Sequence, residues 1–125
     1  MILYPDITPL SERRFRLEED VSYLIKDHMW HIRAGYIYDG ASIPRVAWSI
    51  IGLYPGGIME EPSLVHDSMY RRKGDGVYAR ADADRCFFEM MLEYGVPRVR
   101  AGIAYAAVVC FGRRHWGGPS PYGGV

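Results

Sequence analysis

The 125-residue chain has few cysteines, no net charge and no long apolar run, and each absence excludes a class of protein. Its two cysteines, Cys86 and Cys110, form neither a disulfide framework nor a zinc spacing, so we expect two small buried side chains in a protein made in a reducing compartment. Fifteen basic residues balance fifteen acidic ones, which gives no general attraction to nucleic acid. The longest apolar run, residues 101–112, is shorter than the about 20 residues of a transmembrane segment, and the N-terminus lacks the features of a signal peptide. The length predicts one globular domain.

Alternation of apolar and polar residues predicts strands in the first third of the chain, after an extended lead-in over residues 1–11. The alternating segments are residues 14–17, 21–25, 30–34 and 36–38, with turns near 18–20 and 26–28. We expect a small antiparallel sheet or meander. His28 and His31 would point to opposite faces of a strand, so we do not expect them to bind a metal together.

Helical patterns follow the strands. Ser42 as N-cap and Pro44 in the first turn mark the first helix start. The four predicted helices cover residues 45–51, 63–72, 80–94 and 96–112. Glycines at 74 and 76 separate the second from the third, which favours an antiparallel pair. The predicted fold is α+β, with a small N-terminal antiparallel sheet and about four helices in one domain over residues 1–112. A Gly- and Pro-rich tail over residues 113–125 should be mobile unless a partner holds it.

The residues that suggest chemistry lie on the predicted central helix pair. His66 and Tyr70 are four residues apart and share a helix face, with Asp67 about 100° around the helix from His66. If the two helices pack antiparallel, Asp84 can reach His66 and orient it as a general base, a role worth about 10²–10⁴-fold in rate. Asp67 then remains for a hard cation such as calcium, with carbonyl groups of the loop GLYPGG as further ligands. The predicted calcium ligands are Asp67, Gly52, Tyr54 and Gly56.

Other residues are candidates for supporting roles, each with a structural alternative. Asp39 and Asp82 either lie behind the site, or serve only as a turn residue and a helix-dipole partner. Trp48 and Met59 are candidates for the apolar rim of a substrate cleft. The basic cluster at 71–73 suits the negative end of a helix dipole, and the alternative is contact with a phosphate surface.

Two motifs on this helix pair resemble a known enzyme superfamily. HDSMY followed by ADRCF resembles the HDxxY…ADxxF pattern of phospholipase A2-type enzymes, in particular their bacterial and parvoviral-capsid branches. The resemblance implies that His66 activates water, that Asp67 binds calcium and that Asp84 holds the histidine. In those enzymes the glycine-rich calcium loop lies further upstream of the His-Asp pair than GLYPGG does here.

A broader resemblance covers residues 38–112. YDGASIPR, VHDSMY, ADRCFFEMM and GVPRVRAGIAYAAVVCFG, in this order, are similar to the domain-of-unknown-function family 1353. This resemblance implies a phage or prophage setting and supplies no function.

Three functional hypotheses follow. The first is a phage-encoded hydrolase, made in the cytoplasm of a bacterial host, that acts on an ester such as a phospholipid and meets a lipid surface. The second is a virion or tail-assembly protein, in which His66 and Asp84 are only a hydrogen-bonded core pair. The third, an HD-type metal phosphohydrolase, is disfavoured because it requires a further helical histidine upstream. An enzyme requires His66 and Asp67 in an open cleft, whereas a structural protein would bury them.

Overall fold

The structure is a computed structural model that describes residues 7–9, 14–39 and 60–117. Its strands are β1 (Ile7–Pro9), β2 (Arg14–Leu17), β3 (Val21–Ile25), β4 (His28–Ile32) and β5 (Ile37–Asp39). Its helices are α2 (Glu60–Arg71), α3 (Arg80–Glu93) and α4 (Arg98–Phe111), with the 3-10 helices η1 (Lys73–Gly76) and η2 (Arg113–His115). The predicted α+β class is confirmed. The described residues contain three α-helices rather than the predicted four, since the helix predicted at 45–51 lies outside them.

The strands β2 to β5 form one long hairpin with an interruption in its middle. β2 pairs antiparallel with β5, and β3 with β4. The numbers of paired residues add to 53 in both halves, as in Arg16 with Ile37 and Val21 with Ile32. The register is therefore continuous across the interruption, and a hydrogen bond from the Leu17 N–H to the Tyr36 carbonyl (2.8 Å) extends it. β1 lies in the predicted lead-in and completes a three-stranded sheet in the order β1-β2-β5.

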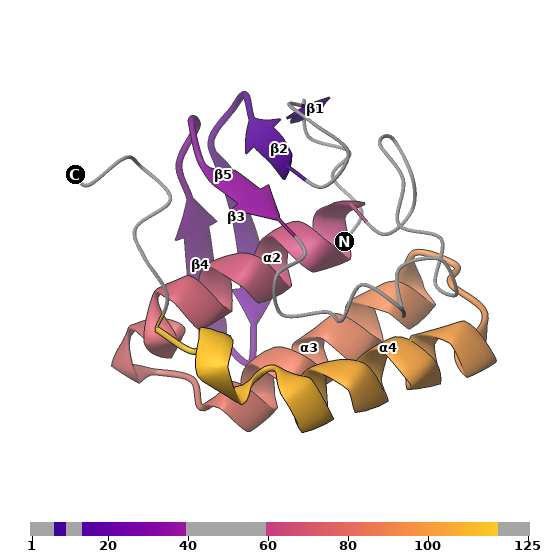
Figure 1. The fold of residues 1–125 in the computed structure, drawn as a ribbon. Coiled ribbons are helices and arrows are strands. Elements are labelled where there is room, and N and C mark those ends of the chain that lie inside the picture. The colour runs from indigo at the N-terminus through magenta and orange to yellow at the C-terminus, as the bar shows by residue number, and fades with distance from the viewer. Residues whose placement is uncertain (1–6, 10–13, 40–59, 118–125) are drawn as a thin grey trace.

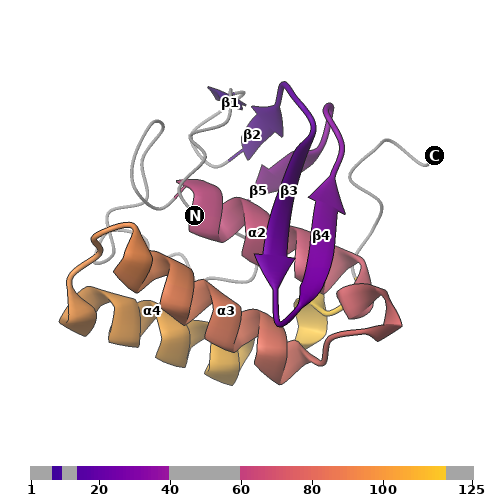
Figure 2. The ribbon, with the colours of Figure 1, turned by 180° about the vertical axis from the view of Figure 1, so that it is seen from behind.

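One face of the hairpin packs on α2. Along β3, Val21, Tyr23 and Ile25 are buried, whereas Leu24 between them is exposed. The same alternation buries Trp30 and Ile32 of β4. Helix α2 lies between the strands and the α3–α4 pair (Figure 1), and the view from behind shows β3 and β4 on the side away from α4 (Figure 2). The polar residues of α2 are therefore enclosed on both sides.

Helix α4 has a buried and an exposed side. Its alanines at 101, 104 and 107 pack towards α3, whereas Val99 and Phe111 are exposed, although the apolar run over residues 101–112 favours a helix buried on several faces. Cys110 is exposed as well, which corrects the prediction that both cysteines are buried. Cys86 is half-buried, and burial raises the pKa of its thiol to about 12. None of the helices among the described residues has the length and apolar character to cross a bilayer.

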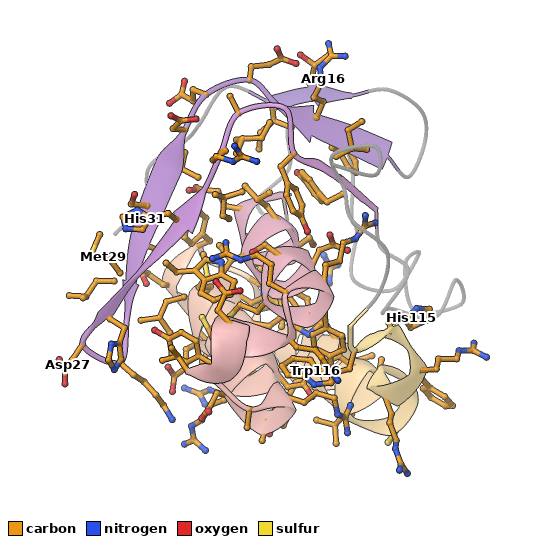
Figure 3. All side chains as sticks on the ribbon, turned by 90° about the vertical axis from the view of Figure 1, so that its left-hand side faces the viewer. Arg16, Asp27, Met29, His31, His115 and Trp116 are labelled. Atoms are coloured by element: carbon orange, nitrogen blue, oxygen red, sulfur yellow. The ribbon has the colours of Figure 1, made fainter. Side chains whose placement is uncertain are left out.

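The start of the C-terminal segment, which the sequence predicts to be mobile, is packed against α2. The ring of Trp116 meets that of Tyr70 edge-on, with 5.2 Å between centroids, and the Gly117 N–H donates to the Tyr70 carbonyl at 2.7 Å. Trp116 lies beneath the end of α2 (Figure 3). Tertiary contacts thus fix residues 113–117, and residues 118–125 lie outside the described part of the chain.

The turn between β3 and β4 offers a test of this hairpin. Lys26 and Asp27 both have positive φ (48° and 67°), as a two-residue turn of type I′ requires, and Asp27 lies at the tip (Figure 3). We expect Asp27→Gly to raise the free energy of unfolding by about 0.5 kcal/mol, because glycine adopts this conformation without a Cβ clash. In urea denaturation, Gly35→Ala is the matched control, since Gly35 has φ of 89° and open space around it, and should lower stability by about 1 kcal/mol. A loss of stability in Asp27→Gly would contradict the turn type.

Candidate functional site

Helices α2 and α3 pack so that Asp84 meets two side chains of α2. Asp84 Oδ1 lies 2.9 Å from His66 Nε2 and accepts the Tyr70 O–H at 2.6 Å. His66 and Tyr70 share the α2 face that is turned to α3, because four residues make about one helical turn. Asp84 lies in the second turn of α3, four residues after Arg80. The predicted approach of Asp84 to His66 is confirmed, whereas the catalytic roles stay predictions.

This network is closed off from solvent. His66 and Asp84 are each 2% exposed, and the histidine ring packs against those of Tyr70 and Phe87, with 4.3 and 4.6 Å between centroids. Burial lowers the pKa of His66 below its ordinary 6.5, with Asp84 opposing this shift and Arg80 adding to it. Burial, together with the bond to Asp84, raises the pKa of Tyr70. His66 is therefore neutral at pH 7, and Tyr70 is a permanent hydrogen-bond donor.

Arg80, the first residue of α3, supplies a positive charge that the sequence analysis missed. Its Nη1 lies 3.7 Å from Asp84 Oδ2 and 3.3 Å from the Tyr70 hydroxyl oxygen. The guanidinium also donates to the carbonyls of Val108 (3.3 Å) and Val109 (3.4 Å), which belong to the last turn of α4. The spacing of four residues between Arg80 and Asp84 is a signal for such a pair. No local pattern indicates that the end of α4 would meet it.

Asp67, the predicted calcium ligand, belongs to a different set of contacts. Its Oδ2 accepts the Tyr36 O–H at 2.6 Å and lies 3.1 Å from Arg71 Nε, and the residue is 6% exposed. Arg71 therefore already neutralises the carboxylate that a cation would use. Within the described residues there is no group of three or more His, Cys, Asp or Glu side chains that could hold a metal. Calcium thus stays a prediction, because Gly52, Tyr54 and Gly56 lie outside these residues.

Of the residues predicted behind the site, Asp82 has described contacts, and they are structural. Asp82 accepts the Ala79 N–H at 2.9 Å and pairs with Lys26 Nζ at 2.5 Å, so it caps α3 and ties it to the β3–β4 turn. The bond from Lys26, followed by that from Ala79, lowers the pKa of Asp82. Asp39 is the last residue of β5, and its side chain lies outside the described structure. The rim residues predicted by sequence also lie outside it, namely Trp48 and Met59.

The two upstream histidines and the basic cluster have structural contacts. His31 Nδ1 lies 2.6 Å from Ser22 Oγ on the neighbouring strand, and His31 projects outward from β4 (Figure 3). Arg72 bonds to Asp75 and its guanidinium lies 3.8 Å from the centre of the Trp30 ring.

A row of aromatic donors on the hairpin bonds to three other buried polar residues of α2. Tyr23 donates to Glu61 at 2.6 Å, and Trp30 donates through Nε1 to Ser68 at 2.9 Å. Together with the Tyr36–Asp67 bond, they give α2 three anchors on the hairpin. Sequence reasoning could not pair these residues, because the partners lie 31 and 38 positions apart.

Comparisons with known proteins place the chain in a family. It belongs to the family described as "Protein of unknown function (DUF1353)", which it matches over residues 15–108. It is 34% identical over 99 residues, 78% of its length, to "Uncharacterized protein y4jT" of Sinorhizobium fredii (strain NBRC 101917 / NGR234), and the match spans 29% of that protein. No solved structure matches the chain significantly. The broader of the two resemblances is thereby confirmed, and the phospholipase A2-type resemblance is not.

The hydroxyl of Tyr70 provides a test of the buried network. We expect Tyr70→Phe to lower the free energy of unfolding by about 1.5–3 kcal/mol, because a hydrogen bond to a buried carboxylate is lost while the ring stays. The measurement is urea denaturation followed by circular dichroism. Tyr105→Phe, on a half-buried tyrosine of α4, is the control and should change stability by less than about 0.5 kcal/mol. Equal losses in the two variants would show that Asp84 does not depend on Tyr70.

The lowered pKa of His66 predicts how stability varies with pH. The folded state disfavours protonated His66, so below pH 6.5 the unfolded chain binds more protons than the folded chain does. The free energy of unfolding therefore decreases as the pH is lowered below 6.5. Above that value the contribution of neutral His66 is complete. We expect the stability difference between the wild type and His66→Gln to shrink from about pH 7.5 to about pH 5. Parallel pH profiles of the two proteins would contradict a buried neutral histidine.

Proposed function

We propose that the protein is a hydrolase that acts on an ester bond, with His66 as general base and phospholipids as the substrate class. The observation that supports this proposal is the pairing of His66 Nε2 with Asp84 Oδ1, in a carboxylate site that Tyr70 and Arg80 also hold. A histidine oriented by a fixed carboxylate is the arrangement that general-base catalysis requires.

Each group of the network has a role in this proposal. With its proton on Nε2, His66 donates to Asp84, and Nδ1 is the atom that takes a proton from the attacking water. The lowered pKa of His66 keeps the ring in the neutral form that a base needs. Once Nδ1 is protonated, the carboxylate of Asp84 stabilises the imidazolium. Tyr70 and Arg80 are positioning residues, since they hold Asp84 and do not contact the substrate in this proposal.

A second function, a structural protein of a virion or tail assembly, is favoured by the burial of the same residues. His66 is 2% exposed and Asp67 is 6% exposed, and such closure is what we expect of a core pair. In that case the network would only specify how α2 packs on α3. The phage or prophage setting and synthesis in a bacterial host belong to both candidate functions, and their support is the sequence resemblance alone.

A hydrolysis assay distinguishes the two functions. We expect the purified protein to release fatty acid from a short-chain phosphatidylcholine, measured by pH-stat titration, and His66→Gln to reduce turnover by about 10²–10⁴-fold. The matched control is Tyr23→Phe, which removes another buried hydrogen bond of α2, to Glu61, without touching His66. The assay runs in calcium and in a chelator, because Asp67 is the predicted calcium ligand.

Each outcome of this assay has a defined meaning. Loss of turnover in His66→Gln but not in Tyr23→Phe supports the hydrolase. A folded wild type without turnover in either condition leaves the structural function. Turnover that needs calcium and disappears in Asp67→Asn would add the predicted metal role. Turnover that is unchanged in His66→Gln would exclude His66 as the base.

A further inference from the structure

The charges of the chain are divided unevenly along its length. All fifteen acidic residues and eleven of the fifteen basic ones lie before Gly95, so residues 1–94 carry a net charge of −4. The remaining residues carry no acid and four arginines, which gives +4. The overall neutrality therefore hides a basic C-terminal quarter, and such asymmetry is typical of proteins that bind an anionic partner.

The four arginines flank helix α4. Arg98 and Arg100 lie in its first turn, and Arg113 and Arg114 directly follow it in η2. All four are exposed, and none forms an ion pair with any described residue. Cations in the first turn of a helix are disfavoured by the helix dipole. Helix stability thus gives no reason for Arg98 and Arg100.

Between the two arginine pairs, the outer side of α4 has no charge. Val99, Ile103, Ala106 and Cys110 are all exposed, and their spacing of i, i+4, i+7 and i+11 places them on one stripe. Val99 is 76% exposed, and Phe111 at the end of the helix is 60% exposed. The opposite side of the helix packs on α3 through alanines at 101, 104 and 107. We define the apolar stripe as Val99, Ile103, Ala106 and Cys110, with Phe111 at its end.

We propose that the outer side of α4 docks on the surface of an anionic lipid bilayer. The apolar stripe would enter the boundary of headgroups and acyl chains, and the arginines on either side would meet lipid phosphates. Figures 1 and 2 show α4 on the side of the molecule opposite to β3 and β4, so no described strand stands in the way of a flat surface. This proposal concerns binding, and it holds whether or not His66 is catalytic.

Other partners fit this surface less well. A second copy packed on the same face would bring two sets of four arginines together, and the segment from Gly95 onwards has no acid to neutralise them. A nucleic acid would satisfy the arginines, but it would leave Val99 and Phe111 against a charged backbone. A bilayer with anionic headgroups is complementary to both the apolar stripe and the charges.

Vesicle co-sedimentation of the full chain tests the proposal. We expect binding to phosphatidylcholine vesicles that contain phosphatidylglycerol, weaker binding at high salt, and little binding to phosphatidylcholine alone. Arg98→Gln and Arg100→Gln should each weaken binding by about five-fold, and Val99→Ser should weaken it too. The matched control is Leu24→Ser, since Leu24 is 66% exposed but lies on β3, on the other side of the molecule.

Cys110 permits a second measurement that reports depth. It is exposed on the stripe, whereas burial raises the pKa of Cys86 to about 12, so a thiol-reactive fluorophore labels Cys110 selectively at neutral pH. A polarity-sensitive label at Cys110 should shift to shorter wavelength when anionic vesicles are added. The same label on Leu24→Cys, in a Cys110→Ser background, should not shift.

Several results would overturn the proposal. The first is that the folded wild type does not bind the anionic vesicles. The second is that Leu24→Ser weakens vesicle binding as much as Val99→Ser does. The third is that the protein binds a duplex oligonucleotide but no vesicles, and that Arg100→Gln abolishes the binding of the oligonucleotide. A fourth is a stable dimer that hides Cys110 from the label. His66→Gln should bind vesicles like the wild type, so a failure of hydrolysis and a failure of docking are measured separately.

Discussion

Asp84 is a carboxylate at 2% exposure, and the packing of the helices depends on satisfying it. A charge buried without partners would cost several kcal/mol. The chain brings two donors from α2, His66 and Tyr70, and a guanidinium from the start of α3. Because side chains on a helix turn by about 100° per residue, a slip of one residue in either helix would remove these donors. The network therefore fixes the register of α2 against α3.

The same constraint reaches the end of the chain. Arg80 extends from Asp84 to the carbonyls of Val108 and Val109 in the last turn of α4, where the Val108 carbonyl also accepts the Gly112 N–H. Gly112 lets this end approach closely, because a Cβ there would lie 2.7 Å from the Tyr70 hydroxyl oxygen. Trp116 then covers the Tyr70 ring. On the opposite side of α2, aromatic donors from the hairpin bond to Glu61 and Asp67. One helix is thus anchored by polar contacts to every layer around it.

Patterns of short range made the fold predictable. Strand alternation was readable because only one face of the hairpin is buried, as with Tyr23 and Leu24. The Gly-containing turn between α2 and α3, with the spacing of His66 and Asp84, was enough to predict their pairing. The contacts of Arg80 and Trp116 could not be predicted, since they depend on which helix end each residue meets in the folded protein. The Gly- and Pro-rich composition after Arg113 predicts only the local flexibility of the chain. It does not indicate that Trp116 packs against Tyr70. Cys110 was predicted to be buried because the apolar run over residues 101–112 does not indicate which side of the helix faces solvent.

The two candidate functions make opposite use of one feature of His66. Burial keeps the ring neutral, which a general base needs at pH 7, but burial also makes the protonated ring costly. Asp84 offsets that cost, and Arg80 adds to it by placing a positive charge nearby. In the proposed hydrolase, the negative charge that develops on the oxygen of an ester under attack would favour proton uptake by His66. In a protein without substrate the same balance leaves the histidine as a neutral, hydrogen-bonded core residue. The geometry of the pair is common to both functions, and the difference between them lies in whether an ester can reach Nδ1.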